Sequence, residues 1–297
     1  MLWRPDGRLA RDLPPERKMF PLIMRRRNEA AVYYDVNADA TRLEPAIEAW
    51  NAAHPDVQIS PFHVVVWALV ETLEIRPNLN RFVSGGRIWD RDGIYISYAV
   101  KADLADDSSP LITVKRRLQA GRPFADMVKH LRGDAASARS AKKGASATEL
   151  EMRAMGCLPV LVQRFIYELY RGLDGLGLIP APLLRGDPLY TSACVANLGS
   201  IGLDPVYHHL FEHGTGSVFC VVGRLGDAVV ASEAEPSASG AHVRAPQPVV
   251  RRTLPLRFTI DERVCDGLYM QRALQAFQGL VEDPSLALGG ETPPAAS

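Results

Sequence analysis

The chain has 297 residues, of which 47% are hydrophobic and 23% charged, and its 34 basic side chains equal its 34 acidic ones in number. This length and apolar content fit one large globular domain or two modest ones with a substantial core. The balanced charge gives no general reason to expect nucleic acid as a partner.

Two further features of the composition concern the compartment. The four cysteines are scattered without Cys-x-x-Cys spacing, and we expect them to be buried thiols in a reducing environment. They are Cys157, Cys194, Cys220 and Cys265. The first residues are rich in arginine and aspartate and lack an apolar signal core, which predicts a cytoplasmic protein.

The N-terminal part of the chain predicts an arm that leads into the main domain. Residues 1–18 are rich in arginine, proline and aspartate without periodicity, as in an arm or an ordered lead-in. We expect the main domain to span residues 19–288 and residues 289–297 to form a disordered tail. The arginines at 25–27 allow three interpretations: a phosphate site, a solvated basic turn, or a partner for a carboxylate such as Asp266.

A strand and two helices are predicted next. Residues 30–36 have the pattern of a strand, and Thr41 and Glu44 have the spacing of a capping box at the start of a helix. Ser60 and Pro61 open a second helix, with serine as the cap and proline in the first turn. Its interior is apolar nearly all round, which predicts that it is buried.

The middle of the chain combines strands, a helix and an unusual apolar segment. Residues 94–100 alternate as a strand, and residues 111–115 predict another. Apolar residues between 124 and 131 share one face of a helix. Residues 134–148 are rich in alanine, serine, lysine and glycine and predict a mobile connection. Residues 158–170 carry an apolar face interrupted by charges, which argues against a membrane span.

A glycine-rich turn and two adjacent histidines follow. Residues 194–202 place the turn after a strand, and residues 217–223 and 227–231 predict two more strands. His208 and His209 point apart on any regular element, so they do not converge on a metal. We therefore expect no zinc site here, and ordinary hydrogen-bonded or exposed histidines are the simplest interpretation.

The chain's clearest pattern lies near its C-terminus. Every second residue from Leu254 to Ile260 is apolar, which predicts a half-buried strand. If the pleat continues, Glu262 falls on the apolar face, where burial of a carboxylate costs free energy and favours its protonated form. Asp266 and Gly267 then mark a turn.

After this turn the spacing becomes helical. Six apolar residues form one stripe: Met270, Ala273, Leu274, Phe277, Leu280 and Val281. Asp283 and Pro284 end the helix. An ionisable group between such a strand and helix is a candidate functional site.

The run from 258 to 267, with the helix that follows it, resembles the C-terminal signature of the dihydrolipoamide acyltransferase catalytic core of 2-oxo acid dehydrogenase complexes. Chloramphenicol acetyltransferase shares this fold and signature. The signature reads His-x-x-x-Asp-Gly; Asp266 and Gly267 match it, and Glu262 stands in place of the histidine. The resemblance is strong over 254–284, moderate over 190–225 and 30–100, and absent over 135–185.

The resemblance implies an α/β two-layer sandwich, with a mixed sheet covered by helices and an insertion at about 135–185. It also implies a homotrimer with active sites between subunits, with a larger assembly as a further option. The expected reaction transfers an acyl group between coenzyme A and a thiol or hydroxyl acceptor. No lipoyl or peripheral-subunit-binding segment is found before the core, so we expect no covalent lipoyl group, and no metal.

Several residues receive roles from the resemblance. Glu262 becomes the candidate base, although a carboxylate is intrinsically a weaker base than imidazole by about 3 kcal/mol. Asp266 would hold the turn through an arginine. The family's oxyanion hydroxyl falls at Ala196, which leaves Asn197 or Ser200 as donors, unless they only cap the turn. A histidine of the 208–209 pair is an alternative base or a partner for Glu262.

Three accounts of the function follow. The first is an active acyltransferase. The second is an inactive trimeric scaffold, a pseudoenzyme, which the departures at Glu262 and Ala196 favour. The third is a binder of acyl-CoA or another hydrophobic ligand through residues 158–180. For this segment we weigh core or subunit packing first, the wall of an acyl pocket second and an interfacial membrane helix last.

Overall fold

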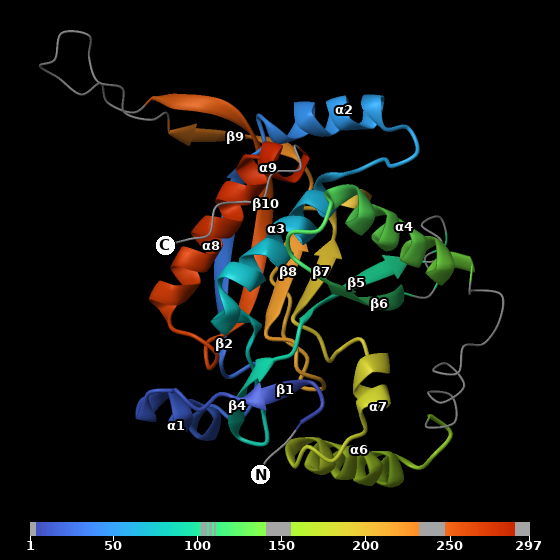
Figure 1. The fold of residues 1–297 in the computed structure, drawn as a ribbon, viewed down its shortest axis with the longest axis vertical. Coiled ribbons are helices and arrows are strands. Elements are labelled where there is room, and N and C mark those ends of the chain that lie inside the picture. Colours follow the sequence, from blue (N-terminus) through green and yellow to red (C-terminus); the bar gives the residue numbers. More distant parts are fainter. Residues whose placement is uncertain are drawn as a thin grey trace, which may run out of the picture.

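The computed structural model describes residues 4–101, 106, 109, 111–140, 156–231 and 247–288 (Figure 1). The helices are α1 (Pro15–Ile23), α2 (Leu43–Ala53), α3 (Pro61–Ile75), α4 (Phe124–Ser140), α6 (Val160–Gly175), α7 (Ala181–Gly186), α8 (Gly267–Glu282) and α9 (Ser285–Leu288), with short 3₁₀ turns η1 (Pro77–Asn80) and η3 (Gly199–Ile201). The strands are β1 (Gly7–Leu9), β2 (Ala31–Asp39), β3 (Phe82–Ser84), β4 (Arg87–Arg91), β5 (Ile94–Lys101), β6 (Leu111–Leu118), β7 (Ala193–Asn197), β8 (Val218–Val222), β9 (Gly226–Ala231) and β10 (Pro248–Asp261).

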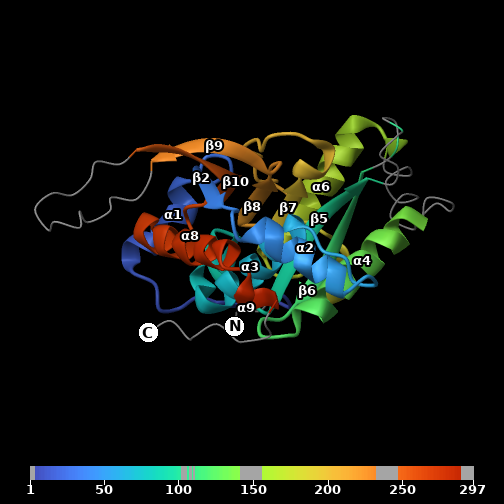
Figure 2. The same cartoon turned by 90° about the horizontal axis from the view of Figure 1, so that it is seen from above.

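A mixed seven-stranded sheet forms the centre of the molecule. Its strands run in the order β2-β10-β8-β7-β5-β6, and β9 pairs with the first half of β10. The β5–β7 and β7–β8 pairs are parallel, whereas β2, β8 and β9 are antiparallel to β10. Helices α2, α3, α4 and α8 lie on one face of this sheet (Figure 2), which makes the predicted two layers.

The core lies between these two layers. Ser60 and Pro61 begin α3 as predicted, and the residues of this helix from Val64 to Leu73 are all buried. All six apolar residues of the predicted C-terminal stripe are buried on α8. The predicted α/β architecture and its buried faces are therefore confirmed.

A smaller sheet, β1-β4-β3, lies with α1, α6 and α7 at one end of the larger sheet (Figure 1). Arg4 connects these parts because its buried guanidinium donates to Ser84 Oγ over 2.7 Å and to the carbonyl and carboxylate of Asp174. Gly85 and Gly175 approach so closely that a Cβ on Gly85 would lie 2.0 Å from the Gly175 carbonyl oxygen. The N-terminal segment is thus anchored to both β3 and α6.

Two local predictions are wrong. Thr41 does not cap α2; the Glu44 carboxylate instead binds the Arg252 guanidinium at 2.8 and 3.1 Å, so no capping box forms. Residues 134–140, predicted to be a mobile connection, form the last turns of α4, since the alanines there favour helix and Asp134 pairs with Arg116. The remainder of that connection lies outside the described residues.

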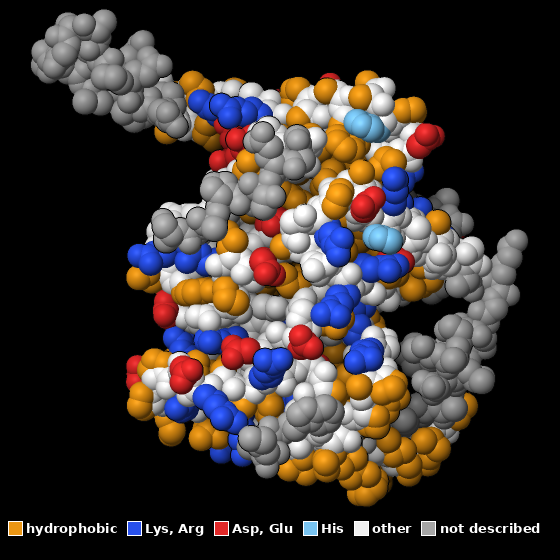
Figure 3. Space-filling view, in the orientation of Figure 1, with side chains coloured by type: hydrophobic (Ala, Val, Ile, Leu, Met, Phe, Trp, Pro, Cys, Tyr) orange, Lys and Arg blue, Asp and Glu red, His pale blue; other side chains and the backbone are white. Residues whose placement is uncertain are grey.

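Helix α6 is not a core helix. Its apolar stripe faces outward, with Leu161 80%, Phe165 69% and Leu169 53% exposed, and Asp174 is its only buried residue. Figure 3 shows the apolar side chains gathered along this end of the molecule. The interpretation of residues 158–170 as core packing is therefore wrong, while subunit packing, a pocket wall and a membrane surface remain open.

Two compositional expectations can be compared with the structure. Cys194, Cys220 and Cys265 are buried free thiols as predicted, whereas Cys157 is exposed because it lies at the outer start of the α6 segment. Among the described residues, no helix is long and apolar enough to cross a membrane.

The cap of α3 yields a prediction about pH. The Ser60 N–H donates to His63 Nδ1 over 3.1 Å, which requires a neutral imidazole, and burial together with the nearby Arg132 lowers the pKa of His63 to about 4. The unfolded chain therefore binds a proton at mildly acidic pH that the folded chain excludes.

We expect the free energy of unfolding to fall as the pH drops from about 6.5 to about 4, with a contribution from His63 of up to about 3 kcal/mol. His63→Gln keeps an acceptor at this position without titrating, and should lose less stability over the same range. Urea denaturation of both proteins at pH 7 and pH 4.5 measures the difference. Equal losses in the two proteins would contradict this account.

Candidate active site

The candidate site is built on the turn between β10 and α8. β10 ends at Asp261, and Asp266 is the N-cap of α8, where its Oδ1 accepts from the Tyr269 N–H over 2.8 Å. An aspartate suits this position because its side chain satisfies an otherwise unpaired amide of the first helical turn. Residues 262–265 therefore form a short connection fixed at both ends.

A buried ion pair fixes the conformation of this turn. Asp261 is 0% and Arg263 2% exposed. The Arg263 guanidinium donates to Asp261 through Nε over 2.8 Å and Nη2 over 2.7 Å, and its Nη1 donates to the Met24 carbonyl over 2.9 Å. A bidentate pair of this kind is strong and directional. The buried carboxylate of this segment is thus that of Asp261, on the face of the strand opposite to Phe258 and Ile260.

Glu262 lies immediately beyond the strand and is partly buried. Its N–H donates to the Ala30 carbonyl over 2.9 Å, and its carbonyl accepts from Arg17 Nη1 over 2.7 Å. Its carboxylate has no hydrogen bond or ion pair among the residues that the structure describes. The backbone of Glu262 is therefore held firmly, while the carboxylate remains available.

Two titratable groups near Glu262, Tyr34 and Cys265, are neutral. Partial burial, with the nearby Cys265 and Glu262, raises the pKa of Tyr34, and Tyr34 donates to Met270 Sδ over 3.4 Å. Burial raises the pKa of the Cys265 thiol to about 12, so this group stays protonated at neutral pH. Both groups therefore keep their protons at pH 7, and neither gives a proton to the Glu262 carboxylate.

Asp266 has no arginine partner in the described part of the chain. Of the three arginines at 25–27, Arg26 lies 3.9 Å from Glu29 at the surface, and the buried Arg27 donates to backbone carbonyls such as that of Phe211 over 2.8 Å. The expected pairing of Asp266 with an arginine is therefore not formed. The Asp261–Arg263 ion pair holds the turn instead.

The turn after β7 holds the candidate oxyanion donors. Asn197 ends β7, its Oδ1 accepts from the Ser200 N–H over 3.2 Å, and the Ser200 hydroxyl donates to the Asn197 carbonyl over 2.8 Å. Gly199 is required because a Cβ there would lie 2.3 Å from the Gly223 carbonyl oxygen. Ser200 is thus already engaged, whereas Asn197 Nδ2 has no partner within the described ranges and is the better donor.

The register of the sheet separates these donors from Glu262. Asn197 pairs with Val222 of β8, and Val222 pairs with Leu256 of β10, six residues before Glu262. At about 3.3 Å per residue this places the two groups about 20 Å apart along the strands. A single chain therefore does not bring Glu262 and Asn197 to one acyl group.

The adjacent histidines also lie away from Glu262. The His208 ring stacks on Phe219 with centroids 3.9 Å apart and on His209 at 4.5 Å, and burial lowers the pKa of His208. Phe219 points to the face of the sheet opposite to α3 and α8, because its neighbours Val218 and Cys220 belong to the main core. Neither histidine is a partner for Glu262 within one chain.

The structure reveals an acid–base pair that we did not predict. His213 Nε2 lies 2.6 Å from Asp187 Oδ2, and the rings of Tyr167, Tyr170 and Tyr190 surround the imidazole at 5.6 to 5.8 Å. Burial alone would raise the pKa of Asp187, but hydrogen bonds from His213 and the Leu189 N–H lower it overall. Carboxylates orient imidazoles in this way in many hydrolytic sites. The two residues are distant in sequence and form no motif.

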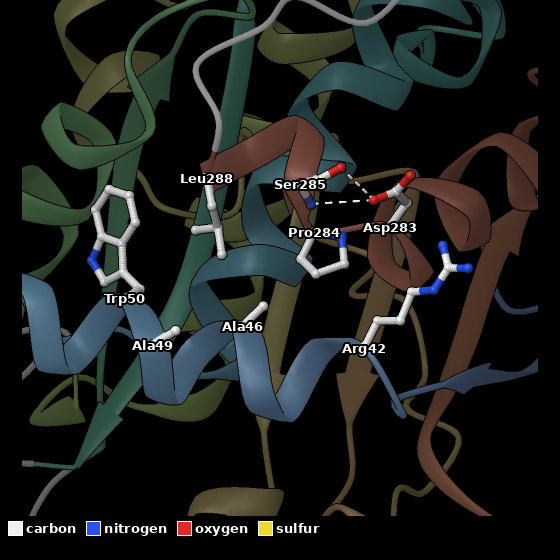
Figure 4. Close-up of a pocket in the computed structure, with 8 residues that line it drawn as sticks. All are labelled: Arg42, Ala46, Ala49, Trp50, Asp283, Pro284, Ser285 and Leu288. Carbon is white, nitrogen blue, oxygen red and sulfur yellow. Dashed lines mark hydrogen bonds between the residues drawn. The ribbon is translucent and has the colours of Figure 1, made fainter.

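A groove between α2 and α9 lacks such chemistry. It measures about 550 Å³ (Figure 4). Its one carboxylate, Asp283, accepts from the Ser285 N–H and hydroxyl at 3.3 and 2.5 Å, and Arg42 lies at the rim. Among the described residues, no three His, Cys, Asp or Glu side chains are grouped so as to hold a metal.

Comparison with known proteins identifies the fold. No protein-family model matches the chain, and no curated protein matches it. A probable dihydrolipoamide acetyltransferase from Listeria monocytogenes aligns with a TM-score of 0.56 at 16% identity, over 92% of this chain and 94% of that one. The cubic core of a pyruvate dehydrogenase multienzyme complex gives 0.56 at 17%, over 94% of both chains, and chloramphenicol acetyltransferase gives 0.50 at 14%, over 93% and 98%. The predicted chloramphenicol acetyltransferase-like fold is confirmed.

The buried pair yields a prediction about stability. Asp261→Asn leaves the Arg263 charge buried without a counterion, which should lower the free energy of unfolding by about 3–5 kcal/mol. Urea denaturation measures this loss. Asp266→Asn is the matched control, since asparagine keeps the cap and should cost only a few tenths of a kcal/mol. A loss below about 1 kcal/mol in Asp261→Asn would show that the pair does not hold the turn.

Proposed function

We propose that this protein transfers an acyl group between coenzyme A and a thiol or hydroxyl acceptor, in a site that two copies of the chain complete. The observation that carries the proposal is the placement of two groups that have no partner among the described residues, the Glu262 carboxylate and Asn197 Nδ2, at opposite ends of one sheet. Two copies can bring opposite ends together, as a head-to-tail interface does. The likeness of fold to acyltransferases supports this reading.

The proposed reaction needs one base and one oxyanion donor. The Glu262 carboxylate takes the proton of the acceptor as its sulfur or oxygen attacks the thioester carbonyl carbon. Asn197 Nδ2 of the neighbouring copy donates to the oxygen that becomes negative. The tetrahedral intermediate then expels the coenzyme A thiolate, which regains a proton from the Glu262 carboxylic acid.

The surroundings of Glu262 suit a base made from a carboxylate. Within one chain it is only partly buried, and a neighbouring copy that covers it would remove more water and strengthen it as a base. The Asp261–Arg263 pair and the two backbone hydrogen bonds of Glu262 fix its position without consuming its charge. Unlike histidine, it offers no N–H donor when it is ionised.

We infer a homotrimer in the cytoplasm, and the exposed stripe of α6 is a candidate contact between copies. Apolar surface of this kind on a water-facing helix usually marks an interface. A further step to a larger assembly has a parallel in the cubic core named above. No part of this proposal requires a metal or a covalent lipoyl group.

A second account is a scaffold or acyl-CoA binder without turnover. Ala196 has no hydroxyl, and the Ser200 hydroxyl is already donated to a backbone carbonyl, so the oxyanion site has one side-chain donor at most. Thermal stabilisation by coenzyme A would argue against a pure scaffold. Turnover separates the enzyme from the binder.

Glu262→Gln should lower acyl transfer from acetyl-CoA to a simple thiol by about a hundredfold or more, because the amide cannot accept the acceptor's proton. Binding of coenzyme A, measured by thermal shift, and the oligomeric state should not change. Glu48→Gln, at an exposed position on α2, is the control and should retain full activity. Unchanged turnover in Glu262→Gln would remove this residue from the mechanism.

Sharing of the site between copies can be tested by complementation. Asn197→Ala should also lose about a hundredfold in turnover. When Asn197→Ala and Glu262→Gln chains are co-expressed, a site works only if each copy supplies its intact residue, so about a quarter of the wild-type activity should return. No recovery in isolated mixed oligomers would contradict a site built from two copies.

A further inference from the structure

A second pocket, away from Glu262, collects positive charge. It is a cavity of about 420 Å³ between the small sheet, the start of β5, the end of β6 and α7. Four cationic side chains line it: Arg91, Lys115, Arg117 and Arg185. Figure 3 shows Lys and Arg side chains gathered between the levels of β6 and α7.

This charge is only partly offset within the described part of the chain. None of the four cations forms an ion pair within 4.0 Å there. The lining also contains Asp6 and Asp92, but Asp6 is bound to the Arg4 guanidinium at 2.9 and 3.0 Å. The positive charge that remains around the cavity favours binding of an anion.

Lys115 stabilises the wall of the pocket through backbone contacts and does not extend into the cavity. Its Nζ donates to the carbonyls of Leu184, Asp187 and Tyr190 at 2.8, 2.6 and 3.2 Å, which ties β6 to α7. All three ammonium protons are thereby used. Burial lowers the pKa of Lys115 to about 8, so the side chain stays charged at neutral pH. This charge makes the electrostatic potential in the cavity more positive.

Arg91 is a fixed cation in the wall of the pocket. Its Nη1 and Nη2 donate to the hydroxyl and carbonyl of Thr215 at 3.0 and 2.8 Å, and its guanidinium lies 4.4 Å from the centre of the Phe82 ring. Its Nε is buried and has no hydrogen bond within the described residues. Because this atom is closed off from water, a ligand in the cavity does not reach it, and Arg91 contributes its positive charge to the pocket.

Arg117 and Arg185 are the two cations of the lining that have no hydrogen-bond partner in the described ranges. Neither makes an ion pair there, and they approach the pocket from β6 and α7 respectively. The Arg117 guanidinium lies 5.9 Å from the centre of the Tyr95 ring. Two free guanidinium groups across one cavity match the several acceptor oxygens of a phosphate.

We propose that this pocket binds a phosphate monoester of a small organic molecule. Arg117 and Arg185 bind the phosphate, Arg91 and Lys115 add positive charge from the wall, and the organic part packs on Tyr95, Tyr190 and Leu184. The four cations and two carboxylates of the lining leave an excess of two positive charges, which matches a phosphate monoester dianion better than a single carboxylate, and inorganic phosphate fills only part of 420 Å³. The proposal does not depend on acyl transfer.

Calorimetric titration with phenyl phosphate tests the proposal, with phenol as the probe that lacks the phosphate. We expect saturable binding of phenyl phosphate that weakens with salt, and none of phenol. The double variant Arg117→Gln/Arg185→Gln should bind at least about tenfold more weakly, since it loses two charge-assisted contacts at the surface. Arg164→Gln, on exposed α6, is the matched control and should bind as the wild type does.

Glu262→Gln should bind phenyl phosphate normally, so a failure of the acyltransferase proposal does not affect this one. Coenzyme A and its 3′-dephospho form distinguish the source of the phosphate. A preference for coenzyme A that the double arginine variant abolishes would identify the acyl donor as the ligand; equal binding of both forms would assign another phosphate ester. Equal affinity of wild type and double variant for phenyl phosphate, or no saturable binding by the wild type, would overturn the proposal.

Discussion

The turn that carries Glu262 depends on one buried ion pair. Asp261 and Arg263 lie on either side of Glu262 in the sequence, and their bidentate contact removes both charges from water while it fixes the backbone between them. Separating the pair would leave one charge buried and unpaired, which costs far more than an exposed pair contributes. The position of Glu262 is therefore set by its neighbours and not by its own side chain.

Much of the fold could be predicted from the sequence because its elements have simple periodicities. The alternation from Leu254 to Ile260 and the stripe on α8 each bury one face against the same core. The burial of Asp261 was not predictable, because its carboxylate is paired with Arg263, which is held in turn by the carbonyl of Met24, far away in sequence. Period-two patterns identify one apolar face but do not show what covers the other.

The same limit applies to the sites. Asp187 and His213 have no motif spacing, and the cations of the phosphate pocket come from β4, β6 and α7. Long-range contacts of this kind require the sheet order, which brings β7 between β5 and β8. Asn197 shows the converse: its turn was recognisable, but only the register revealed that it lies at the far end of the sheet from Glu262.

The outward stripe of α6 has a thermodynamic consequence. Contacts made by Leu161, Phe165 and Leu169 would take apolar area out of water, and such burial is driven by entropy near room temperature and lowers the heat capacity. Its strength therefore declines on cooling. The copies of an assembly held together by this helix would therefore associate more weakly on ice than at room temperature. Cooling would then separate the copies that a shared active site needs.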